Sequence, residues 1–174
     1  MTNAVRQKQL SIHVKAAATP SDEQLAKIRT YTLVDFPAED LYVRTFALAH
    51  NAIDRDNECF GEALLLDFAR TLPGKGLFIK HPMGWDGDTG PGEGRWFAAE
   101  LVRMSHDEAR AMLRTPGLQF PPDHHDAVLL MASAYMVRTD ENGALLRKMD
   151  AGIVSDVSIS FTAKDRERLR DAAG

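Results

Sequence analysis

The amino-acid sequence predicts an α+β fold in which strands and helices are interleaved. Short segments with alternating apolar and polar residues indicate strands, and segments with apolar residues three and four positions apart indicate amphipathic helices. These patterns predict about six strands and four helices, with no internal repeat and no linker that divides the chain. Irregular loops as well as helices join the predicted strands, which is unlike the regular alternation of α/β proteins.

The first half of the chain carries one clear helix start and several strands. Residues 1–19 form a weak pattern, in which only the alternation over residues 10–14 indicates an edge strand. A helix is predicted to begin beside Pro20 and to run through Leu25, Ile28 and Arg29, because Pro and acidic residues are typical of a first turn. The following patterns predict a strand at 42–48, a polar turn at 51–57, an amphipathic helix at 59–71 and a short strand at 77–79 that can bury both faces.

The second half begins with a polar loop over residues 83–94 that contains five glycines. Ser105 and Glu108 form a capping-box pattern, which predicts the start of a helix. Gly152 is typical of a helix exit. The remaining patterns predict a strand at 96–102, a Pro-rich segment at 115–126, a long apolar strand at 127–137 and a short helix at 142–149.

Length and composition indicate a single domain over residues 1–174 with an ordinary core, since 44% of residues are hydrophobic and 26% are charged. We expect residues 1–19 to be weakly ordered and residues 162–174 to form a charged tail or helix. The net charge of −4 argues against a nucleic-acid-binding protein. No apolar run is long enough for a membrane span, and no signal peptide is recognised. The single Cys59 fits a reducing cytoplasm and is interpreted as a half-buried thiol.

The segment from Asp150 to Phe161 carries the strongest candidate site. A turn rich in Gly, Ser and Asp leads into a strand in which Val157 and the next apolar residues point one way, while Ser158 and Ser160 point the other. A serine on an open strand face is a candidate nucleophile if a base can reach it. His81 ends the short apolar strand that begins near Gly76, and it is the candidate base.

These motifs resemble the prohead (capsid-maturation) proteases of tailed phages, which are similar to the herpesvirus assemblins. The resemblance rests on His81-Pro82 after an apolar strand and on Val-Ser-Ile-Ser-Phe at 157–161, and it runs from about Leu33 to Phe161. It implies that Ser158 is the nucleophile and His81 the base, and that Ser160 stands where the family usually has glycine. It also implies a small, mostly antiparallel β-barrel flanked by helices.

The family's third catalytic residue generally follows the serine by some tens of residues. This chain offers only Asp165, Glu167 and Asp171 after Ser158, in a segment whose alternating charges predict a solvated helix. Four alternatives stay open: the third residue lies elsewhere, the chain is truncated, a Ser-His pair works alone, or the protein has lost activity.

The resemblance implies a serine endopeptidase that cleaves phage scaffold and major capsid proteins in the host cytoplasm, within the assembling procapsid. The alternative is a catalytically silent structural or scaffold-binding head protein of the same fold. We expect the protein to bind no cofactor, metal, nucleic acid or membrane. Whether it is a monomer or a homo-oligomer stays open.

Three other motifs favour ordinary structural roles. The glycine-rich loop after His81 lacks the ending of a phosphate-binding loop and is interpreted as a flap. Asp123-His124-His125-Asp126 has the residue types of a metal site, and a metal-dependent hydrolase is a third hypothesis, but no matching Cys or His pair accompanies it. Asp54 to Glu58 lacks the glycine and the last acid of a calcium loop, so we predict a turn with internal carboxylate hydrogen bonds.

Overall fold

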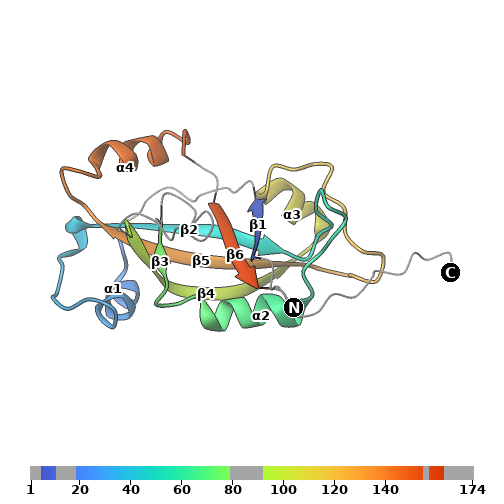
Figure 1. The fold of residues 1–174 in the computed structure, drawn as a ribbon, viewed down its shortest axis with the longest axis horizontal. Helices are drawn as coiled ribbons and strands as arrows, with labels where there is room; N and C mark the ends of the chain where they lie inside the picture. The colour runs from blue at the N-terminus through green and yellow to red at the C-terminus, as the bar shows by residue number, and fades with distance from the viewer. Residues whose placement is uncertain (1–4, 11–18, 79–91, 155–156, 163–174) are drawn as a thin grey trace.

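The computed structural model describes residues 5–10, 19–78, 92–154 and 157–162, and it confirms the predicted α+β class (Figure 1). Four antiparallel strands in the order β2-β5-β4-β3 curl into a half-barrel, and β1 pairs with β6 in a separate antiparallel ribbon. The strands are β1 (Val5–Leu10), β2 (Leu41–His50), β3 (Gly76–Leu77), β4 (Gly94–Met104), β5 (Ala127–Val137) and β6 (Val157–Thr162). The helices are α1 (Asp22–Arg29), the 3-10 turn η1 (Ala38–Asp40), α2 (Glu62–Thr71), α3 (His106–Met112) and α4 (Gly143–Asp150).

The main core lies on the half-barrel where β2, β4 and β5 pair. Phe46 of β2 is opposite Ala132 of β5, and its ring meets Trp96 of β4 edge-to-face at a centroid distance of 5.5 Å. Helices α2, α3 and α4 add buried apolar side chains to this cluster, among them Leu65, Ala109 and Leu146. Burial of these side chains is the principal force that holds the helices to the sheet.

A second, smaller core packs α1 against the sheet. Ile28 of α1 is buried with Val43 of β2, Phe97 of β4 and Tyr135 of β5. Val43 and Tyr135 are paired across the strands, and they alternate with residues of the main core, so they lie on the opposite face of the sheet. The half-barrel is therefore covered on both faces.

The predicted helix at 59–71 and the predicted strand at 77–79 differ from the structure at their ends. Helix α2 begins at Glu62 rather than at residue 59, because Asp54 accepts the Glu58 backbone N–H at 3.0 Å and holds the preceding residues in a turn. Strand β3 covers only Gly76–Leu77, and Ile79 lies outside the described residues. Phe78 is 41% exposed, so the prediction that this segment buries both faces is wrong.

The N-terminal segment contains a strand that the sequence did not predict. Residues 5–10 form β1, whereas we expected weak order there and an edge strand over residues 10–14. The strand is polar in sequence, and its partner β6 lies about 150 positions later in the chain. Pairing between distant segments, rather than local propensity, stabilises it. Residues 11–14 lie outside the described residues.

Gly94 closes the predicted glycine-rich loop and is also the first residue of β4. A Cβ atom at this position would lie 2.4 Å from the Tyr135 carbonyl oxygen and 2.7 Å from the Met136 side chain. Only glycine therefore lets β4 approach β5 here. Residues 83–91 of the predicted flap lie outside the described residues.

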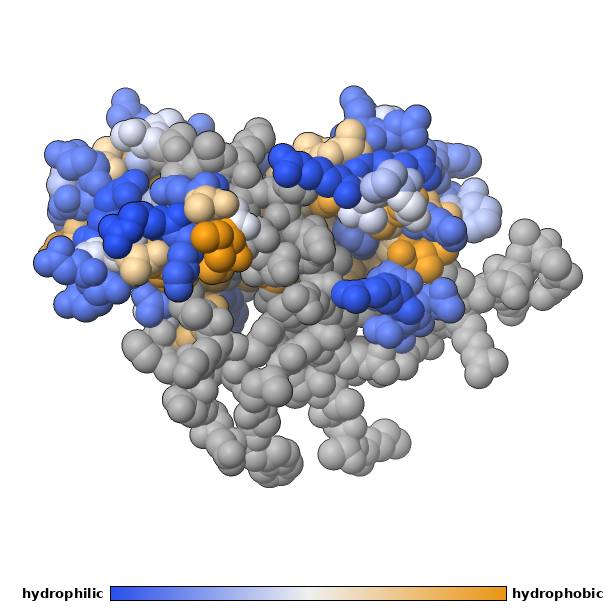
Figure 2. Space-filling model, turned by 90° about the horizontal axis from the view of Figure 1, so that it is seen from above, coloured by the Kyte–Doolittle hydropathy of each residue, from blue (hydrophilic) through white to orange (hydrophobic). Residues whose placement is uncertain are grey.

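The described surface is mostly hydrophilic on the face shown in Figure 2, with separate small apolar areas. No helix in the described part of the chain has both the length and the apolar character needed to cross a bilayer. The exposed large apolar side chains of the described residues are Leu33, Val34, Leu64, Leu66, Phe78, Met112 and Ile153.

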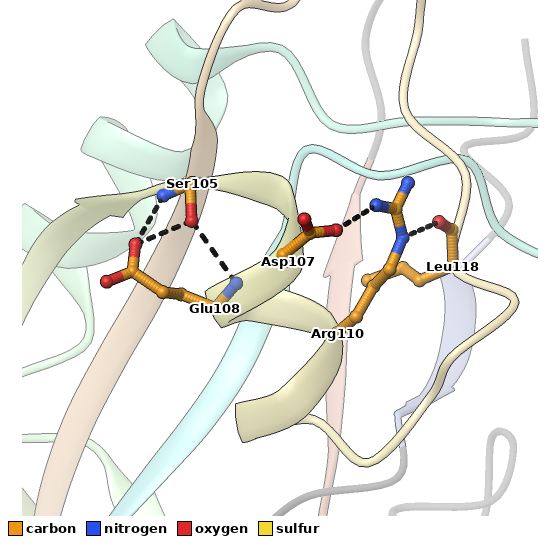
Figure 3. Close-up of polar contacts among 5 residues, drawn as sticks. All are labelled: Ser105, Asp107, Glu108, Arg110 and Leu118. Carbon is orange, nitrogen blue, oxygen red and sulfur yellow. Dashed lines mark hydrogen bonds and ion pairs between the residues drawn. The ribbon is translucent and has the colours of Figure 1, made fainter.

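Helix α3 begins with the predicted capping box (Figure 3). The Ser105 hydroxyl accepts the Glu108 backbone N–H at 3.3 Å, and the Glu108 carboxylate accepts the Ser105 backbone N–H at 2.8 Å. The Ser105 hydroxyl also donates to the Glu108 carboxylate at 2.7 Å. This bond and the one from the Ser105 backbone N–H hold the pKa of Glu108 below its usual range, because both favour the charged carboxylate. Arg110 then ties the helix to the following loop by donating to the Leu118 carbonyl at 3.0 Å.

Candidate active site

The candidate nucleophile Ser158 lies in β6, where its backbone is the partner of Gln9 in β1. The first residue of the strand, Val157, packs against the main core. Ser160 is opposite Gln7 in the same ribbon. The side chains of Ser158 and Ser160 lie outside the described residues, so which way each hydroxyl points stays a prediction.

The candidate base His81 lies outside the described residues, three positions after Phe78. Strand β3, which leads toward it, pairs with Gly94 and Arg95 at the edge of the larger sheet. The segment with Asp165, Glu167 and Asp171 is also outside the described residues. The proximity of His81 to Ser158 and the identity of a third residue are therefore still predictions.

The chain that approaches Ser158 leaves α4 through a closely hydrogen-bonded turn. Gly152 adopts a φ of +69°, as the predicted helix exit requires, and its N–H donates to the Met149 carbonyl at 3.1 Å. The N–H groups of Ile153 and Val154 both donate to the Lys148 carbonyl, at 2.9 and 3.2 Å. These bonds set the direction of the chain four residues before Ser158.

A buried polar cluster fixes the start of this turn to the half-barrel. Arg44 of β2 is only 4% exposed, and its guanidinium forms a short ion pair with Asp150, the last residue of α4. Arg44 Nε also donates to the Tyr42 hydroxyl at 2.6 Å, and that hydroxyl donates to Asp150 Oδ1 at 2.9 Å. A buried guanidinium without such partners would be strongly destabilising. We name Tyr42, Arg44 and Asp150 the Arg44 cluster.

Two cations flank the ring of Tyr42 at the same site. The guanidinium carbons of Arg44 and Arg138 each lie 5.2 Å from the ring centroid, a distance at which a cation and an aromatic ring attract. The backbone N–H of Arg138 donates to the Asp40 carbonyl at 2.8 Å, which holds the end of β5 beside β2. Tyr42 thus lies at a junction of β2, β5 and α4.

The stability of the protein should decrease at alkaline pH because of Tyr42. Burial raises the pKa of its hydroxyl above the ordinary value of 10.0, since a buried phenolate is poorly solvated. An unfolded chain loses this proton near pH 10, whereas the folded protein keeps it to higher pH. The stabilising contribution is therefore complete below pH 10 and is lost as the pH rises through the folded pKa.

Urea denaturation at about pH 8.5 and about pH 10.5 measures this effect. Tyr42→Phe should show a smaller loss of unfolding free energy between the two pH values than wild type does. An equal loss in the two proteins would contradict the assignment to Tyr42. Burial also raises the pKa of Tyr135. Tyr135→Phe is therefore compared in the same way, and it too should show a smaller loss of unfolding free energy than wild type.

The other predicted motifs among the described residues lie in turns and loops. The Asp54 carboxylate accepts the backbone N–H groups of Asp56 and Glu58 at 2.9 and 3.0 Å, which confirms the predicted turn. His124 and His125 lie in the loop before β5, as expected. The described residues contain no group of three or more His, Cys, Asp or Glu side chains that could hold a metal ion. Cys59 is half-buried, as predicted.

The Arg44 cluster was missed by reasoning from sequence. The strand prediction at 42–48 included Arg44 without a partner for it, and Asp150 was treated only as the start of the nucleophile segment. One signal was present: a charged residue stands in the middle of a segment that otherwise has the pattern of a buried strand. The identity of the partner, which is 106 positions away, could not be obtained from that pattern.

In comparisons with known proteins, no family, no curated protein and no solved structure matches this chain.

Proposed function

We propose that the protein is a serine endopeptidase of the prohead-protease type that cleaves scaffold and capsid proteins in an assembling phage head. The observation that carries the proposal is the hydroxyl-bearing strand β6, which contains Ser158 and is paired along its length with β1. A hydrogen-bonded turn ends at Val154, three residues before this strand, and Val157, the first residue of the strand, packs against the main core. A nucleophile needs such a rigid support, because catalysis depends on accurate placement.

In the proposed reaction Ser158 Oγ attacks the carbonyl carbon of the scissile peptide bond. His81 takes the hydroxyl proton during the attack and then gives it to the departing amine. Water hydrolyses the resulting acyl-enzyme in a second step that uses the same base. Backbone N–H groups near the strand stabilise the negative oxygen of the intermediate, and one such donor contributes about 3 kcal/mol in known proteases.

The assemblin-like barrel belongs to the same proposal. The half-barrel has the order β2-β5-β4-β3, and β6 contacts β2 at one end of it. In Figure 1 the β1–β6 ribbon runs across the long strands of the larger sheet. We propose that this ribbon and the half-barrel together form the small antiparallel barrel of the assemblin type. His81 would then follow β3 at the opposite edge, and closure of the barrel would bring it toward β6.

A catalytically silent head protein of the same fold is the second candidate. The observation that favours it is Ser160, which stands where the related proteases usually have glycine. A side chain at this position would add bulk where glycine would let a substrate backbone approach closely. Such a protein would bind scaffold or capsid protein without cleaving it.

Covalent labelling distinguishes the two candidates. A fluorophosphonate probe reacts with activated serines, and peptide mapping then identifies the modified residue. We expect the label on Ser158, and we expect Ser160→Ala to keep the label. Absence of label in wild type, with chymotrypsin labelled in parallel, would support the silent protein. A label on a different serine would contradict the assignment of the nucleophile.

A further inference from the structure

Asp150 occupies a position on α4 that the helix itself disfavours. The C-terminal end of a helix carries a partial negative charge, which attracts basic side chains and repels carboxylates. Arg147 and Lys148 in the last turn of α4 follow this rule, whereas Asp150 does not. The reason for a carboxylate here must therefore be a tertiary contact.

The tertiary contact is the ion pair with Arg44, and it constrains the direction of the helix more closely than apolar packing does. Leu146 and Met149 already bury the apolar face of α4 in the main core, so the helix is held to the sheet without the ion pair. The Arg44 guanidinium and the Tyr42 hydroxyl both bond the same oxygen of Asp150. Two directed hydrogen bonds to one atom fix the rotation and the axial position of the last helical turn, which apolar contacts leave adjustable.

The fixed point lies close to the nucleophile along the chain. Asp150 is eight residues before Ser158, and the structure describes all but residues 155 and 156 of that interval. The hydrogen-bonded turn carries the chain from Asp150 to Val154, and Val157 re-enters the core at the start of β6. A shift of the last turn of α4 would therefore be transmitted to β6.

We infer that Arg44 and Asp150, joined through Tyr42, are positioning residues that set the place of Ser158 relative to the half-barrel. The inference rests on the proposed function for its effect on activity. Whether the Arg44 cluster controls the position of β6 can be measured even if the protein has no protease activity.

The experiment compares Asp150→Asn with wild type by amide hydrogen exchange and by fluorophosphonate labelling. Asp150 is the residue to change because its side chain is 51% exposed, so the variant is expected to fold. Asp150→Asn removes the charge and keeps an Oδ1 that can still accept from Arg44 and Tyr42, so the buried guanidinium is not left without a partner. Exchange in residues 151–162 should rise by about tenfold or more, while exchange in β4 and β5 changes by less than about twofold. The labelling rate should fall by about tenfold or more, and Asp150→Glu should restore part of both values.

The matched control is Glu62→Gln, which breaks another ion pair between a helix and the half-barrel. Glu62 at the start of α2 bonds Arg103 of β4, and both side chains are about half exposed. Glu62→Gln should leave exchange in residues 151–162 within about twofold of wild type.

Unchanged exchange in residues 151–162 of Asp150→Asn would overturn the inference, and so would an equal increase in β4 and β5. If wild type itself is not labelled, the proposed function fails, and the exchange result still decides whether the Arg44 cluster controls β6. If wild type is labelled and β6 loosens while the labelling rate stays constant, the positioning role is wrong and the proposed function stands.

Discussion

Ser158→Ala is expected to abolish cleavage of a co-expressed capsid-scaffold protein while the fold stays intact. Removal of the nucleophile in a serine protease lowers kcat by about four to six orders of magnitude, because the remaining groups cannot replace the covalent step. Loss of one hydroxyl from β6 leaves the backbone pairing with β1 unchanged. The measurement is the fraction of scaffold cleaved over time, with circular dichroism of each variant as the test of folding.

Ser160→Ala is the matched control, since it removes the other hydroxyl of the same strand. Its effect on cleavage should be much milder. Equal activity of wild type and Ser158→Ala would refute the assignment of the nucleophile. Equal inactivity of the two proteins would support the silent head protein instead.

Phe46→Ala is expected to lower the free energy of unfolding by about 3–5 kcal/mol. Phe46 is 2% exposed and contacts Trp96 edge-to-face, so truncation leaves a cavity between β2 and β4 that the surrounding strands cannot fill. Urea denaturation followed by tryptophan fluorescence measures the change. A loss below about 1 kcal/mol would show that the main core is not centred on this contact.

Leu33→Ala is the control for the Phe46 variant. Leu33 is a large apolar residue that is fully exposed in the segment between α1 and η1. Its truncation removes no buried contact, so the free energy of unfolding should change by less than about 0.5 kcal/mol. A large loss here would indicate that this segment is covered by other parts of the protein in solution.

The elements that the sequence predicted well are those whose stability is local. Strand β5 was predicted over residues 127–137, and the structure gives the same bounds, because its apolar run ends in Pro-rich and polar segments. Helix α3 followed from the capping box of Ser105 and Glu108. Hydrogen bonds and burial patterns within a short segment are visible in the sequence itself.

The elements that were missed depend on contacts between distant segments. Strand β1 is polar and exists through its pairing with β6. Arg44 is buried and donates hydrogen bonds to Tyr42 and to Asp150, and Asp150 belongs to a different element. Patterns with periods of two or 3.6 residues report which face is buried, and they do not report which remote side chain completes a site.

The candidate site could be predicted only in part for the same reason. Ser158 was assigned to a strand from its neighbours, and the structure confirms that strand as β6. The pairing of Ser158 with His81 requires two segments that are 77 positions apart to meet. Local patterns predict each segment, but only the closure of the fold decides whether they approach one another.

The most direct test of the central claim is the distance between the His81 imidazole and Ser158 Oγ in a crystal structure. We expect the nearer imidazole nitrogen to lie within about 4 Å of the hydroxyl oxygen, as a general base requires. A separation greater than about 8 Å, with both residues ordered and no mobile segment between them, would contradict the serine protease and leave the silent head protein as the better account.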